Sequence, residues 1–245
     1  GLTDVVNVVT NGTTGANLGS FKANNIETIN ITANDTDLTK TTVGTVVTEN
    51  ISTNTLAIDA NKATLLKVDG AGNLTLTLSA ATTEVATINA STMTGAITVT
   101  TNASDTGATT VTGGSANDTI TLKGANDVAI GGAGNDTLIV SGSAASFTTL
   151  TGGAGIDTFD VSGFLAANSG AGAYITDLAV GETIKFNTAA TNFVSSKITL
   201  DPNSTLEQYA QEAASVANTG NTSGIAWFQI GTGATAATYI VQDVN

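Results

Sequence analysis

Apolar and polar residues alternate along the chain in short runs, and the runs recur at a regular interval. Between residues 56 and 90 two apolar columns repeat every ten residues, at Leu56, Leu66, Leu76 and Ala86 and at Ile58, Val68, Leu78 and Ile88. An alternation of period two is typical of a strand with one buried face. The residues between the runs are Asn, Gly, Ala, Ser and Thr, which form turns or occupy little space. The pattern predicts a short strand and a turn in every ten residues.

Two folds place a strand every nine or ten residues, an antiparallel sandwich and a parallel β-solenoid. The period is more regular than a sandwich requires, and the small turn residues suit stacked coils. The Asn-Gly pair that marks tight hairpins occurs only at Asn11-Gly12. These features favour the solenoid for residues 50–162. The likeness of residues 26–34 to residues 85–91 extends the repeat upstream.

A second repeat, rich in glycine, begins near residue 113 and places aspartates nine residues apart. Residues 131–139 (GGAGNDTLI) and 152–160 (GGAGIDTFD) both fit the pattern Gly-Gly-x-Gly-x-Asp-x-U-x, where U is a large apolar residue. Residues 113–121 depart from it by Ala116 in place of the third glycine. Residues 122–130 keep the Asn-Asp pair but lose both leading glycines. Glycine allows turns with φ > 0, and carboxylates together with carbonyls are the oxygen ligands that Ca²⁺ prefers.

This pattern resembles the RTX (repeats-in-toxin) nonapeptide, which binds Ca²⁺ in a parallel β-roll. The resemblance implies that each nonapeptide is half a coil and that an ion sits between turns two half-coils apart. Asp118 and Asp136 would then share one ion, and Asp136 and Asp157 a second ion on the same side. Asp127 would lie on the opposite side, with Asp105 as its upstream neighbour. The implied metal ligands are Gly113, Gly114, Ala116, Asp118, Asp127, Gly131, Gly132, Gly134, Asp136, Gly152, Gly153, Gly155 and Asp157, with Asp105 less certain.

The alternative is that the aspartates belong to ordinary Asx turns, in which their side chains accept local hydrogen bonds and hold no metal. We favour this alternative for Asp59 and Asp69. We favour calcium for the glycine-rich turns, because stacked carboxylates without a cation would repel one another.

After the roll, residues 173–187 resemble the segment that closes many RTX rolls, with Leu178 and Glu182 in place of the usual Phe and Asp. Asp177 and Glu182 are two further candidate ligands, although a solvated turn is equally compatible. Residues 204–217 are predicted to form a helix that begins with a Ser204-x-x-Glu207 capping box. Its apolar stripe consists of Leu206, Tyr209, Ala213 and Val216.

The predicted fold is therefore all-β, a right-handed parallel β-solenoid or β-roll with Ca²⁺-binding turns and a small C-terminal β module that contains one helix. We expect solenoid coils in residues 1–110, the RTX roll in 111–162 and the capping module in 163–245. Two strands after the helix would supply Trp227, Phe228 and Tyr239 to the core of this module. A cap is needed because an open coil end exposes strand edges.

Composition excludes several functions. The chain has 20 acidic and 7 basic residues, all of them Lys, and a formal charge of −13, which disfavours nucleic acid and favours cations. Cysteine and histidine are absent, so disulfides, thiolate or His zinc sites and His-dependent catalytic triads are excluded. No apolar run approaches the roughly 18 residues of a membrane span. The start lacks both a Met and the features of a signal peptide, and we expect a part of a longer protein.

The Thr/Ala/Asn/Gly-rich coils, the nonapeptides and the terminal module together resemble RTX-type surface-layer (S-layer) proteins of Gram-negative bacteria. This resemblance implies type I secretion to the extracellular cell surface, folding driven by Ca²⁺ and self-assembly into a lattice. Contact with cell-surface polysaccharide would fall to other regions. The alternatives are the RTX region of a secreted adhesin or ice-binding protein, which a ladder of Thr would favour, and the non-catalytic tail of an extracellular RTX enzyme. No carboxylate pair stands out as a catalytic one.

Overall fold

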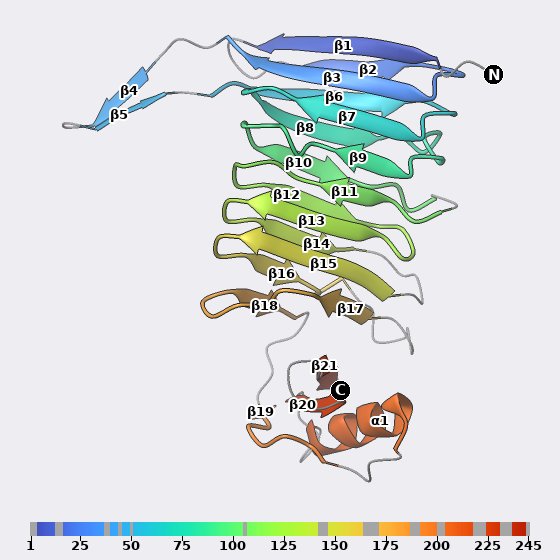
Figure 1. Ribbon diagram of the computed structural model, residues 1–245, viewed down its shortest axis with the longest axis vertical. Helices are drawn as coiled ribbons and strands as arrows, with labels where there is room; N and C mark the ends of the chain where they lie inside the picture. Colours follow the sequence, from blue (N-terminus) through green and yellow to red (C-terminus); the bar gives the residue numbers. More distant parts are fainter. Residues whose placement is uncertain are drawn as a thin grey trace. The chain divides into compact units, whose positions relative to one another are not determined.

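The protein is described by a computed structural model (Figure 1). The described residues are 4–12, 17–36, 40–43, 46–49, 51–104, 107–141, 147–163, 172–186, 192–199, 204–217, 224–230 and 237–243. They form two compact units, Gly1–Lys185 and Phe186–Asn245. Each unit has its own hydrophobic core.

The first unit is a parallel β-solenoid, which confirms the predicted fold class and excludes the antiparallel sandwich. Its strands stack one above another in Figure 1 and form two eight-stranded sheets. The first sheet contains β1 (Val5–Gly12), β3 (Thr28–Asp35), β7 (Leu65–Asp69), β9 (Thr87–Asn89), β11 (Thr110–Thr112), β13 (Val128–Ala133), β15 (Phe147–Ala154) and β17 (Gly172–Ile175). The second contains β2 (Asn17–Lys22), β6 (Thr53–Asp59), β8 (Asn73–Leu78), β10 (Ile97–Thr100), β12 (Thr119–Leu122), β14 (Thr137–Val140), β16 (Thr158–Asp160) and β18 (Thr183–Lys185).

The core of the solenoid consists of apolar columns that run along the stack. The second sheet contributes Leu56, Leu76, Val99, Ile120, Leu138 and Phe159, which lie in register and are at most 2% exposed. Burying each such side chain is worth roughly 1.5–3 kcal/mol. The ten-residue period fails at one expected core position, because Ala86 is exposed and Val85 is buried instead. There β9 begins only at Thr87, so the turn before it is longer than the period requires.

The solenoid continues beyond the expected end of the roll at residue 162. One more coil follows, in which β17 pairs with β15 and β18 with β16, both parallel. Lys185 closes this coil through an ion pair with the carboxylate of Asp160, at 2.7 Å between Nζ and Oδ2. At the other end an unforeseen hairpin of β4 (Lys40–Val43) and β5 (Val46–Glu49) is inserted between β3 and β6.

The second unit contains α1 (Leu206–Ala217) and a sheet in the order β19 (Asn192–Phe193), β20 (Gly224–Ile230), β21 (Ala237–Asp243). β20 and β21 are antiparallel, and the rings of Tyr209 and Tyr239 stack on Phe228 in the core. The predicted capping box is shifted by one residue. Thr205 Oγ1 accepts from Gln208 N at 3.2 Å, and Gln208 Oε1 accepts from Thr205 N at 2.8 Å.

Candidate metal sites

Three turns that lead from the first sheet to the second lie in one stack. They join β11 to β12, β13 to β14 and β15 to β16, and they end at Asp118, Asp136 and Asp157. The following strands pair in register, so the three aspartates occupy equivalent positions in successive coils. Asp136 Oδ1 accepts a hydrogen bond from Asp118 N at 2.7 Å, and Asp157 Oδ1 accepts one from Asp136 N at 2.8 Å. The turns therefore hold a column of carboxylates whose exposure is 1% or less.

The two turns that fit the full glycine pattern share a backbone conformation. Gly132 and Gly134 have φ of 114° and 113°, and Gly153 and Gly155 have φ of 101° and 144°. Such angles are open to glycine and strained for other residues. In the turn of residues 113–118, Ala116 stands at the place of Gly134, and neither the glycines nor Ala116 have a positive φ. This turn therefore has a different shape.

Each of the two full-pattern turns contains a carboxylate oxygen with no hydrogen-bond partner. Asp136 Oδ2 and Asp157 Oδ2 are buried and unpartnered among the described residues. A Cβ added to Gly131 would collide with Asp136 Oδ2 and also with the carbonyl oxygen of Gly152. A Cβ added to Gly152 would collide with Asp157 Oδ2 in the same way. The missing side chains thus let carboxylate oxygens lie against the glycine backbone, and at Gly131 a carboxylate oxygen and a carbonyl oxygen of the next coil both lie close. The same arrangement occurs at Gly113, where Asp118 Oδ2 and the carbonyl oxygen of Gly131 lie close.

A buried carboxylate without a partner is costly in its charged form. The pKa of Asp136 is raised to about 7, mainly by burial. The hydrogen bond from Asp118 N lowers this pKa, and the negative charges of Asp118 and Asp157 contribute to the rise. The side-chain oxygens of Asn30 and Asn54 are also buried and unpartnered, but amides are neutral. The column therefore requires a proton or a cation near Asp136.

The carboxylate and carbonyl oxygens of these turns are suitable ligands for calcium. No three acidic side chains gather within reach of one ion in the described part of the chain. An ion in the stack would therefore combine one carboxylate with turn carbonyls such as that of Gly152. Ca²⁺ accepts six to eight oxygen ligands of this mixed kind in flexible geometry. Asp136 and Asp157 would each hold one such ion, which would neutralise the carboxylate and link neighbouring coils.

Asp118 and Asp127 differ from this pair, because both oxygens of each already accept hydrogen bonds. Asp118 accepts from Ile97 N at 2.8 Å and from Gly114 N at 2.6 Å. Asp127 lies on the opposite side of the solenoid, in the turn between β12 and β13. Its expected neighbour Asp105 lies outside the described residues. Burial raises the pKa of both Asp118 and Asp127, and the hydrogen bonds from their neighbours oppose the rise.

Asp177 and Glu182 stand in the last coil at the positions of Gly152 and Asp157. The carboxylate of Asp177 accepts hydrogen bonds from Gly152 N at 2.9 Å and from Gly153 N at 2.7 Å. In the last coil a side chain, and not a backbone carbonyl, is therefore the acceptor for these two N–H groups. Glu182 Oε2 accepts from Ala179 N at 2.6 Å within its own turn. Neither carboxylate meets the two unpartnered oxygens in a common cluster.

The partners of Asp127 could not be read from the motif. Thr109 N donates to its Oδ1 at 2.8 Å, and Gly124 N and Thr101 Oγ1 donate to its Oδ2, both at 3.0 Å. Thr101 and Thr109 are themselves almost fully buried. The one available signal in the sequence is that Thr101 directly follows a Thr-rich strand, β10.

Comparison with known proteins agrees with this geometry. Residues 104–139 match the family model of the RTX calcium-binding nonapeptide repeat, in four copies. No curated protein matches the chain. Among the described residues no helix is both long and apolar enough to cross a membrane. The chain therefore contains calcium-binding nonapeptide repeats of RTX type within a parallel β-solenoid.

Proposed function

We propose that this protein is a calcium-dependent structural module of a secreted S-layer protein. Ca²⁺ would complete its fold outside the cell and support its assembly into a surface lattice. The observation that carries the proposal is the pair of buried, unpartnered carboxylate oxygens of Asp136 and Asp157 in stacked glycine turns. Extracellular modules bind Ca²⁺ with dissociation constants on the order of 10⁻⁴–10⁻³ M, so these sites would stay empty in the cytosol and fill on export.

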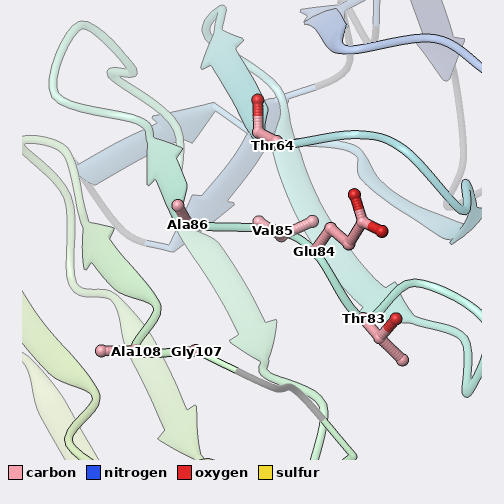
Figure 2. Close-up of a pocket in the computed structure, with 7 residues that line it drawn as sticks. All are labelled: Thr64, Thr83, Glu84, Val85, Ala86, Gly107 and Ala108. Atoms are coloured by element: carbon pink, nitrogen blue, oxygen red, sulfur yellow. The ribbon is translucent and has the colours of Figure 1, made fainter.

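The described surface supports a structural role rather than a catalytic one. A recess of about 240 Å³ is lined by Thr64 and by residues 83–86 and 107–108 (Figure 2). Among the described residues that line it, Glu84 alone is acidic, and it forms an ion pair with Lys62 at 2.7 Å. One exposed, paired carboxylate does not supply the two carboxylates that glycoside hydrolysis uses. RTX repeat proteins are typically secreted, which fits an extracellular module.

The test has a folding arm and an assembly arm. Thermal unfolding of the full chain is followed by circular dichroism in EGTA, in millimolar CaCl₂ and in equal MgCl₂ as a control. We expect the melting temperature to rise with Ca²⁺ and to change little with Mg²⁺. Negative-stain electron microscopy then looks for ordered sheets that form with Ca²⁺ and disperse in EGTA. A melting temperature that ignores Ca²⁺ would refute the calcium role. Stabilisation without ordered sheets would refute the lattice role.

One observation favours a second candidate, a module of an adhesin or an ice-binding protein. The outward face of the second sheet carries an unbroken column of seven threonines, Thr55, Thr75, Thr98, Thr119, Thr137, Thr158 and Thr183, in register. In the first sheet the equivalent column is interrupted by Leu65, Val128 and Tyr174. Thr is rigid at χ1, and neighbouring strands lie about 4.8 Å apart, so the column presents a regular array of hydroxyl and methyl groups.

Thermal hysteresis of the Ca²⁺-loaded protein tests this second candidate. Thr98→Tyr would interrupt the column, and Thr110→Tyr would place the same ring on the first sheet as a matched control. A hysteresis that Thr98→Tyr abolishes and Thr110→Tyr leaves intact would establish the face as an ice-binding surface. Absence of hysteresis in the wild type would reject ice binding.

A further inference from the structure

We infer that calcium occupies only the turns that end at Asp136 and Asp157, and that the turns ending at Asp118 and Asp127 close without metal. The solenoid would then consist of metal-independent coils up to residue 130 and calcium-dependent coils from residue 131 to residue 185. This inference rests on the proposed calcium role. It differs from the four repeats of the family match, which covers residues 104–139 and does not include the Asp157 turn.

The turn at Asp118 is closed by its own backbone. The N–H groups of Ile97 and Gly114 point at the two oxygens of its carboxylate. These donors hold partial positive charge where a cation would have to approach. A cation at this carboxylate would have to share its oxygens with these N–H groups or displace them, and each displaced buried donor would cost about 1–3 kcal/mol. The carboxylate of Asp118 thus acts as a hydrogen-bond acceptor that holds two coils together.

The turn at Asp127 is closed in the same way, with three donors instead of two. Thr109 N, Gly124 N and Thr101 Oγ1 surround the carboxylate at 2.8–3.0 Å. Thr101 also accepts from Lys123 N at 2.8 Å, which ties the carboxylate to the start of its own turn. The site is buried, and both oxygens of Asp127 already accept hydrogen bonds from the protein.

Turns further upstream on this side are closed by neutral side chains. Thr82 Oγ1 donates to Ile58 O at 2.8 Å and accepts from Ala60 N at 3.0 Å. In the next coil, Asn102 Nδ2 donates to the carbonyls of Ser79 and Thr82 at 2.9 and 3.1 Å. Coils before residue 130 therefore have side-chain and backbone partners for their turns and contain no unpartnered buried carboxylate among the described residues.

The coils after residue 130 lack this closure. Their two turns have the glycine angles described above, and each leaves one carboxylate oxygen unpartnered. Without a cation, the charges of Asp136 and Asp157 lie in adjacent coils with little water to screen them. Side-chain contacts that remain between the last coil and the coil before it include those of Asp177 with the glycine turn, of Thr176 with Thr151 and of Lys185 with Asp160. Removal of calcium should therefore loosen this segment first.

The experiment is hydrogen exchange with mass spectrometry on the full chain, in millimolar CaCl₂ and in EGTA, together with the Ca²⁺ stoichiometry from calorimetric titration. We expect two ions per chain. In EGTA, amides of residues 131–160 should lose at least about tenfold in protection while those of residues 53–122 keep theirs. Three or four ions, or an equal loss of protection along the solenoid, would overturn the inference and leave the calcium role standing. No binding at all would overturn both.

Variants assign the ions. Asp118→Asn and Asp127→Asn should each still bind two ions, whereas Asp136→Asn and Asp157→Asn should each bind one fewer. Loss of an ion in either of the first two variants, with the fold intact, would place metal at a turn that we infer to be dry. Because Asp118→Asn removes a buried acceptor and could prevent folding, the wild-type exchange pattern and stoichiometry provide the test that needs no variant.

Discussion

Replacing Asp136 by Asn should stabilise the metal-free protein and weaken its response to calcium. The side-chain oxygen that accepts from Asp118 N is retained in Asn. The new amide group takes the place of the unpartnered Oδ2, which faces the same point as the carbonyl of Gly152. The amide can donate to that carbonyl, so the substitution replaces an uncompensated charge with a hydrogen-bond donor.

The size of the effect follows from the raised pKa of Asp136. At pH 8 the difference between about 7 in the fold and the ordinary value of 3.8 corresponds to roughly 4 kcal/mol, at 1.36 kcal/mol per pKa unit. Local relaxation lowers this figure, and we expect a gain of about 2–4 kcal/mol in EGTA, or several degrees in melting temperature. In Ca²⁺ at a hundredfold its dissociation constant, the variant forgoes about 2.7 kcal/mol from the lost ion.

Urea unfolding at pH 8, in EGTA and in CaCl₂, measures both effects. Asp127→Asn is the matched control, because its carboxylate accepts hydrogen bonds at both oxygens and an amide nitrogen there would face an N–H group. The control should be destabilised by about 1–3 kcal/mol in both buffers. A destabilised Asp136→Asn in EGTA would show that Oδ2 has a partner in the metal-free fold, and the reasoning would fail.

Three further predictions concern pH, glycine and the last coil. The pKa of Asp136 is higher in the fold than in the unfolded chain, so its contribution to stability is fully present below about pH 4 and is lost as the pH rises toward 7. The melting temperature in EGTA should therefore fall over this range, and a flat profile by scanning fluorimetry would contradict this prediction. Gly153→Ala should cost about 1–3 kcal/mol in chemical unfolding, because φ is 101° and the methyl group would strike the Gly132 carbonyl, whereas Gly107→Ala, with open space, should be neutral. Lys185→Met removes the ion pair to Asp160 and should cost about 1 kcal/mol, given that Lys185 is largely exposed; urea unfolding that shows no change would mean that the pair does not hold the last coil.

Much of the solenoid could be predicted because its core follows a simple period. The columns through Leu56 and Ile58 repeat with the coils, and burial of alternate residues confirms them. The period fails where a turn changes length, as before β9, so Ala86 was wrongly placed in the core. The capping box was displaced because Ser204 and Thr205 both begin a Ser/Thr-x-x-Glu/Gln pattern, and only the position of the first helical turn decides between them.

The β4–β5 hairpin was missed because its loop, Gly44-Thr45, is not the Asn-Gly pair that we used as the hairpin signal, although glycine at the first loop position also suits a hairpin turn. The placement of the stacked aspartates followed from the repeat length alone. Whether the second oxygen of each carboxylate is free or occupied did not, because at Asp118 and Asp127 it accepts from a backbone N–H group of the same turn, and every residue except proline supplies such a group.

The third glycine of the motif separates the two kinds of turn. Gly134 and Gly155 hold angles that an alanine adopts only with strain, and in their turns the carboxylate keeps one oxygen without a donor. Ala116 stands at the same position with an ordinary φ, and in its turn the N–H of Gly114 reaches the carboxylate of Asp118. The presence of alanine instead of glycine at this position thus coincides with a carboxylate oxygen that accepts a hydrogen bond, as in Asp118, instead of one that is left for a metal ion, as in Asp136 and Asp157. Degenerate copies of the repeat can therefore keep the coil geometry and the buried aspartate while a backbone donor takes the place of the ion.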